Sequence, residues 1–185
     1  LEIYWDALKI ADEVPAPQAE YIRLAPTVAD LRYRGFSKTD YKHHDLPETP
    51  HYADLASVGQ RWRDLVGYYT RFGDVRELLK GVDDRYVIMN AGDELRLSFP
   101  APPPKGNIKW TRDFVLIGDG WVKDGDYNTT ASKTVGPLPR HGHPDYAAAR
   151  SDDIEADPVY LAHPADWQQY HTRFVDPRAF LRGLR

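Results

Sequence analysis

The stretch RDFVLIGDGWVKDGDYNT, residues 112–129, shapes the interpretation of the whole chain. Its first half is an apolar run typical of a buried strand, so we expect a strand over residues 110–117. Its second half is dense in Gly, Asp and Asn, residues that favour turns. A buried strand that leads into such a loop is one way in which a β-scaffold presents a metal site or a contact surface.

The composition suits one globular domain and excludes several functions. The chain has 185 residues, 42% of them hydrophobic and 12% aromatic, which is enough to build a core. Its formal net charge of −4 argues against general nucleic-acid binding, which needs a basic surface. The absence of cysteine excludes disulfides and thiolate-bound zinc. No apolar run reaches the roughly 18 residues of a membrane-spanning helix, so we expect no transmembrane segment.

Apolar alternation and frequent Pro and Gly predict a mainly-β fold, an antiparallel β-sandwich or jelly roll with one or two short helices and long irregular loops. We expect residues 1–140 to form the sandwich domain. Residues 141–185 would form an irregular extension packed on it or on a partner. The strands are expected at residues 1–10, 21–24, 31–36, 62–69, 85–89, 94–99 and 110–117.

Three local features add detail to this fold. Residues 74–80 have the pattern of a short helix with Asp74 as its N-cap, and a second short helix is expected near residues 166–171. The strands at 85–89 and 94–99 are expected to pair as a hairpin. Residues 37–52 contain three His and two Pro without periodicity, which predicts a long loop.

The acidic part of the opening stretch has the residues of a calcium loop. Asp124, Asp126 and Asn128 place oxygen ligands at alternate positions, as calcium requires. The spacing departs from an EF-hand, because Thr129 stands where that motif needs Gly and Val135 where it needs Glu. The same residues also serve as turn formers. We therefore favour a structural loop without a cofactor, with calcium as the alternative.

Two further patterns contain residue types that bind metals or catalyse reactions. The pair His141 and His143, together with His43, His44 and His51, raises the prospect of zinc, but no spacing of a zinc motif is present. Carboxylates such as Asp113, Asp119 and Asp126 could flank a cleft, but no nucleophile or phosphate-loop motif accompanies them. The sequence therefore favours no catalytic residue.

The aromatic side chains offer a contact surface instead. Trp121 lies between two Gly/Asp-rich stretches, where a loop tip is expected, and exposed aromatics on loops are frequent binding hot spots. With Tyr127 and Asp119 it forms the predicted contact set. The alternative is that Trp121 packs against its own loop.

Several segments resemble, in order and spacing, the C-terminal region of large bacterial proteins with FG-GAP (integrin-like propeller) repeats and an ASPIC/UnbV segment, which are similar to cartilage acidic protein. The similarity covers roughly residues 1–143. The segments that carry it are LEIYWD at 1–6, LRYRGF at 31–36, YTRFGDVRELL at 69–79, DDRYV at 83–87, GDEL at 92–95 and RDFVLIGDGWVKDGDYN at 112–128.

This resemblance implies an exported or surface-associated scaffold rather than an enzyme, and it supplies no catalytic residues. The propeller repeats that bind calcium in that family are not in this chain, so they say nothing about Asp124, Asp126 and Asn128. We interpret the chain as a piece of something larger, because it opens in strand-like sequence without an initiator Met.

We therefore expect a non-catalytic, periplasmic or extracellular interaction module. Its partner would be a protein in a larger assembly, which could be membrane-associated. The alternatives are a carbohydrate-binding β-sandwich, with Trp121 and Tyr127 stacking on sugars while Asp119 and Asp126 bind hydroxyls, and a metal-dependent hydrolase.

Overall fold

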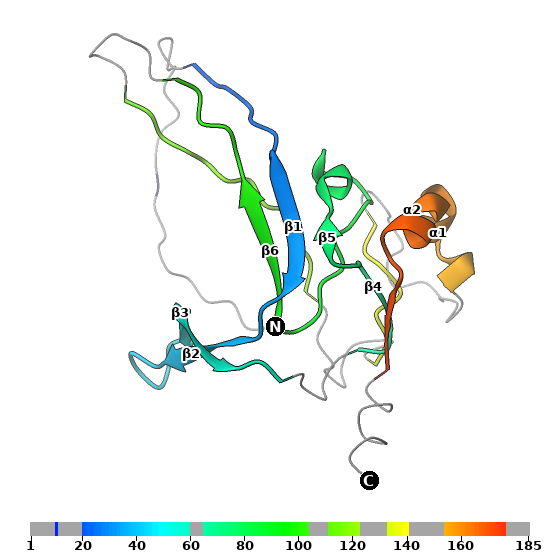
Figure 1. Cartoon of the computed structure of the whole chain (residues 1–185), viewed down its shortest axis with the longest axis horizontal. Coiled ribbons are helices and arrows are strands. Elements are labelled where there is room, and N and C mark those ends of the chain that lie inside the picture. The colour runs from blue at the N-terminus through cyan, green and yellow to red at the C-terminus, as the bar shows by residue number, and fades with distance from the viewer. Residues whose placement is uncertain are drawn as a thin grey trace.

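The computed structural model describes residues 10, 20–59, 65–103, 111–122, 133–140 and 154–176. Within these residues the fold is mainly β, as predicted, with three small antiparallel sheets and two short α-helices. Most of the expected strand at 1–10 lies outside the described residues. The elements in Figure 1, with η for 3-10 helices, are β1 (Val28–Tyr33), β2 (Phe36–Asp40), β3 (Thr49–Ser57), β4 (Gly67–Tyr69), β5 (Gly73–Asp74), η1 (Arg76–Leu79), β6 (Asp93–Ser98), η2 (Ile154–Ala156), α1 (Pro158–Ala162), α2 (Pro164–Gln169) and β7 (Arg173–Val175).

The central sheet has the strand order β5-β1-β6. β1 and β6 are antiparallel, with Leu31 opposite Leu95 and Ala29 opposite Leu97. Because alternate residues of a strand share a face, these four side chains lie on the same side of the sheet. They pack with Leu78 of η1 in the first of two core clusters.

The expected helix at 74–80 is a shorter 3-10 helix, η1. The N-cap residue is Val75 rather than the predicted Asp74, but Asp74, one residue earlier, still binds the start of the helix. Its Oδ1 accepts a hydrogen bond from the Arg76 amide at 3.0 Å. The side chain thereby satisfies one of the amides that a helix start leaves without a partner.

The prediction of a loop at 37–52 was wrong, because β2 and β3 form an antiparallel hairpin there. Its strands were hard to recognise because all nine residues of β3 are exposed, so no apolar face marks them. In Figure 1 this hairpin projects on the side of β1 and β6 opposite to α1 and α2.

Glu94 of β6 connects the hairpin to the central sheet. Its Oε2 accepts a hydrogen bond from the Tyr52 hydroxyl of β3 at 2.6 Å, and Arg34 Nε lies 3.2 Å from the same oxygen. Arg32, which lies opposite Glu94 on the neighbouring strand β1, donates a hydrogen bond to Oε1 of Glu94. The Arg34 guanidinium also lies over the Tyr52 ring, 4.2 Å from its centroid.

The second core cluster joins the C-terminal elements to the middle of the chain. β4 pairs with β7, and the cluster contains Tyr69, Val135, Leu138 and Val159. The short helix expected near residues 166–171 is confirmed as α2. Asp157 caps α1, with its Oδ1 accepting from the Val159 amide at 2.8 Å.

The expected hairpin of 85–89 with 94–99 is half right. Residues 93–98 form β6, but its partner is β1, and residues 85–89 form no strand. The tight connection is present, since the Asp93 amide donates to the Asn90 carbonyl at 3.0 Å. The Ile88 carbonyl instead accepts from the Thr70 amide at 3.0 Å, which draws residues 85–89 toward the end of β4.

The strand expected at 21–24 is also absent, since residues 20–26 are irregular. Among the described residues, no helix is both long and apolar enough to cross a membrane. The division of the chain at residue 140 stays a prediction.

Candidate functional site

The predicted strand at 110–117 is the main correction. Residues 111–117 belong to no strand, and the side chains of Phe114, Val115, Leu116 and Ile117 are 69%, 85%, 75% and 83% exposed. An uninterrupted apolar run indicates burial, but it does not tell where the covering layer comes from. The described residues provide no such layer. We call residues 114–122 the apolar segment.

The apolar segment also contains the described members of the predicted contact set. Trp121 is 45% exposed, beside the equally irregular Asp119, and Val122 is 87% exposed. Trp121 lies outside regular structure. Its expected place at a loop tip stays a prediction, because residues 123–132 lie outside the described residues. Tyr127 lies outside the described residues, as do the three calcium candidates Asp124, Asp126 and Asn128, so the contact set and the calcium loop stay predictions.

Like this segment, many other large hydrophobic side chains of the described residues are exposed rather than buried. Among the described residues eight hydrophobic side chains are buried, whereas 22 large hydrophobic ones are exposed. Single exposed apolar residues are normal on a protein surface, but a continuous run of them marks an interaction surface. Within the apolar segment, Phe114 to Ile117 form the longest such run among the described residues.

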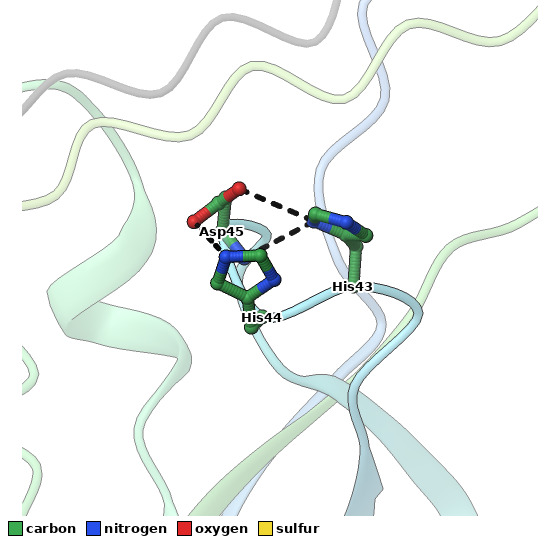
Figure 2. A group of neighbouring side chains, drawn as sticks. All are labelled: His43, His44 and Asp45. Atoms are coloured by element: carbon green, nitrogen blue, oxygen red, sulfur yellow. Dashed lines mark hydrogen bonds and ion pairs between the residues drawn. The ribbon is translucent and has the colours of Figure 1, made fainter.

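A second candidate lies at the tip of the β2–β3 hairpin. The Leu46 amide donates to the His43 carbonyl at 3.1 Å, which closes a turn around His44 and Asp45. The Asp45 carboxylate lies 3.3 Å from His43 Nδ1 and 2.9 Å from His44 Nε2. Figure 2 shows both rings beside this carboxylate. One ligand atom from each of the three residues lies within 4.8 Å of the others.

Only two of the five histidines considered as zinc ligands from the sequence belong to this group. His43 and His44 lie together, whereas His51 of β3 pairs with Asp40 of β2 at 2.5 Å. His141 and His143 lie outside the described residues. Sequence reasoning missed Asp45, although an acid directly after a His pair in a Pro-containing turn was a usable signal.

A third polar group, which the sequence did not indicate, is buried between α2 and β4. His171 is 2% exposed, and its Nδ1 lies 3.1 Å from the Thr70 hydroxyl. That hydroxyl already accepts from the Ile88 amide at 2.7 Å, so its own proton is available to Nδ1. Burial lowers the pKa of His171 to about 4, an effect opposed by the charge of Asp166 and reinforced by that of Arg85. A neutral imidazole in this position belongs to the core.

An open hollow of about 490 Å³ lies along β1, β5 and β6. Asp30 and Arg96 line it from opposite positions of β1 and β6, and Asp74 and Arg76 line it from the other edge. Arg76 is engaged by Asp74 at 2.6 Å. Hydrogen bonds from Arg76, first from its side chain and then from its backbone, lower the pKa of Asp74 to about 2. These charges neutralise each other in part, so the hollow has no dominant charge.

Comparisons of the chain with protein-family models, with curated proteins and with solved structures gave no match.

Proposed function

We propose that this chain is a non-catalytic interaction module that binds another protein through the apolar segment and acts as a subunit or piece of a larger assembly. The single observation that carries the proposal is the exposure of four consecutive apolar side chains, Phe114 to Ile117, each more than two-thirds accessible. Soluble proteins rarely leave such a run in water unless it contacts a partner.

The energetics favour a covered segment. Complete burial of one Val, Leu, Ile or Phe side chain stabilises a structure by about 1.5–3 kcal/mol. Four neighbouring side chains therefore offer an attractive surface to a partner, even after the costs of association are subtracted. Trp121 extends this surface by four residues, and tryptophan is among the residue types that dominate binding energy at interfaces.

The finer statements about fold and place belong to the same proposal. A sandwich or jelly-roll arrangement of the sheets, and a periplasmic or extracellular location, are supported by the resemblance to FG-GAP/ASPIC-UnbV proteins and by the strand-rich composition. The proposed partner is a protein of the same compartment, in an assembly that could be membrane-associated.

Neither alternative function has an observation that carries it. The carbohydrate-binding interpretation needs Trp121, Tyr127, Asp119 and Asp126 together, and only Trp121 and Asp119 lie among the described residues. The hydrolase interpretation needs a cleft with convergent carboxylates or metal ligands. The ligand atoms of His43, His44 and Asp45 lie close together, but these residues are exposed on a turn and do not line a cleft in the described residues.

Site-specific photo-crosslinking in the native host tests the proposal. A benzophenone amino acid at Phe114 replaces one aromatic side chain by another, and the same amino acid at Tyr21, which is 89% exposed, is the matched control. We expect a discrete adduct with one protein from position 114 and none from position 21. Equal adducts from both positions, or none from position 114, would contradict the proposal.

A further inference from the structure

We propose that the turn formed by His43, His44 and Asp45 binds a divalent transition-metal ion, with Zn²⁺ as the best-fitting ion. The proposal does not depend on the proposed interaction function. It follows from the way in which the β2–β3 hairpin places two imidazoles and one carboxylate around one point (Figure 2).

The backbone of the turn sets this convergence. The bond from the Leu46 amide to the His43 carbonyl closes the chain upon itself within four residues. The side chains of consecutive residues, which would diverge along a strand, therefore gather at the tip. The ring centroids of His43 and His44 are only 4.3 Å apart and tilted by 41°.

The strands below the turn hold it in place. Directly beneath the turn, the Tyr41 hydroxyl donates to Glu48 across the hairpin. One step further down, Asp40 and His51 form their own pair at 2.5 Å. These pairs connect the two strands at the neck of the hairpin, so the three donors project from a closed turn rather than from an open loop.

The donor atoms decide which ion fits. Imidazole nitrogen suits zinc, copper, iron and nickel, whereas calcium and magnesium prefer sites made only of oxygen. Zinc accepts nitrogen and carboxylate oxygen at about 2.0–2.2 Å, which in a tetrahedron places neighbouring donors about 3.3–3.6 Å apart. The Asp45 carboxylate already lies beside both rings, with Oδ2 3.3 Å from His43 Nδ1 and Oδ1 2.9 Å from His44 Nε2. One ligand atom from each of the three residues lies within 4.8 Å of the others, so the side chains must draw closer together to bind one ion.

Three protein donors leave one position of a tetrahedral zinc ion for water or for a ligand from a partner. The side chains of His43, His44 and Asp45 are 58%, 79% and 69% exposed, so an ion reaches them directly from solvent. In the described contacts each ring is held only by Asp45, without an outer group to orient it. We therefore expect weaker binding than at a structural zinc site.

The test is calorimetric titration of the tag-free full chain with ZnCl₂. The chain supplies its own control, because its sequence contains a second pair of histidines, His141 and His143, separated by one residue. We compare wild type with His43→Ala/His44→Ala and with His141→Ala/His143→Ala, so that each variant loses two imidazoles. We expect one equivalent of zinc to bind to the wild type and to the second variant. The first variant should lose at least about tenfold in affinity, the scale of removing even an outer partner of a metal ligand.

Cobalt absorption and circular dichroism complete the test. Co²⁺ in the wild type should give the intense visible bands of a tetrahedral site, and these bands should be absent from the first variant. Circular dichroism checks that each variant is folded. If the double variant unfolds, Asp45→Asn replaces it, because Asn keeps the turn preference and removes the charged ligand. A wild type that binds no zinc, or a loss confined to His141→Ala/His143→Ala, would overturn the proposal.

Discussion

Arg85 holds Asp166 through two parallel hydrogen bonds, Nε to Oδ2 at 2.9 Å and Nη2 to Oδ1 at 2.7 Å. The two residues are 81 positions apart, and Asp166 is buried in α2. This bidentate pair anchors α2 to residues 83–86, between the two core clusters. Among the described residues it is one of two such charged connections between the C-terminal elements and the middle of the chain, the other being Arg173 with Asp93. Paired hydrogen bonds to a charged group exceed neutral ones in strength.

Replacement of Asp166 by Ala should therefore destabilise the protein markedly. The change leaves the Arg85 guanidinium without its carboxylate in a partly buried position, and such a loss costs about 3 kcal/mol in free energy of unfolding. Glu77→Ala is the control, because it breaks only the exposed pair with Lys80 and should cost less than about 1 kcal/mol. Urea unfolding measures both. Equal losses would show that the buried pair has no special role.

The burial of His171 predicts a loss of stability in mild acid. Its pKa is lowered to about 4 in the folded protein, whereas the unfolded imidazole has its usual value of about 6.5. As the pH falls below 6.5 the unfolded chain takes up this proton and the folded protein does not, so the free energy of unfolding decreases. The contribution lost between pH 7 and pH 5 is about 2 kcal/mol.

His171→Gln isolates this effect from the titration of carboxylates, which both proteins share. Urea unfolding at pH 7 and pH 5 should give the wild type a decrease larger than that of the variant by this amount. The same decrease in both proteins would mean that His171 takes up its proton without loss of stability.

The bond between Tyr52 and Glu94 should be visible in the titration of Glu94. Its pKa is lowered first by the hydrogen bond from Tyr52 and then by those from Arg32. Tyr52→Phe should therefore raise the pKa of Glu94 toward its usual value, which NMR of the side-chain carboxyl detects. Tyr41→Phe, which removes the hydroxyl that donates to Glu48, is the matched control and should leave Glu94 unchanged. Similar shifts in both variants would argue against a direct contact between hairpin and sheet.

Gly92 should not tolerate a side chain. Its φ of +83° lies in the left-handed region, and an added Cβ would lie 2.6 Å from the Tyr33 ring. Gly92→Ala should cost about 1–2 kcal/mol in free energy of unfolding from the backbone angle alone. Gly118→Ala meets no atom within 4 Å and should be neutral in thermal and urea unfolding. A neutral Gly92→Ala would show that this turn adapts.

The elements that sequence predicted well have local causes. Of the strand expected at 31–36, residues 31–33 belong to β1, where alternation places Ala29 and Leu31 on one face. Asp74 binds the start of η1 through its own hydrogen bond to the chain. Both signals lie within a few residues of the element that they predict. The same is true of α2, where the sequence around Asp166 was sufficient.

The wrong predictions at 37–52 and 110–117 have a common physical reason. The local sequence does not show which other segment a strand pairs with or which one covers it. The β2–β3 hairpin has no apolar face, so its strands lack the pattern by which strands are recognised. The run from Phe114 to Ile117 has the composition of a buried strand, but composition cannot tell whether the cover is in the same chain. Of the candidate sites, Trp121 was inferred from its position between two Gly/Asp-rich stretches and stays a prediction. Asp45 became a candidate only through the folded turn.

The most direct test of the interaction function is the size of the native complex. The tagged chain, produced in its native host, is compared with Val115→Asp/Ile117→Asp and with the control Val58→Asp/Val82→Asp, whose original side chains are 65% and 59% exposed. Native mass spectrometry of the purified material should show wild type and control in a larger assembly with the same second protein, and the first variant alone. All three proteins running alone, or all three retaining the same partner, would contradict an interaction through the apolar segment.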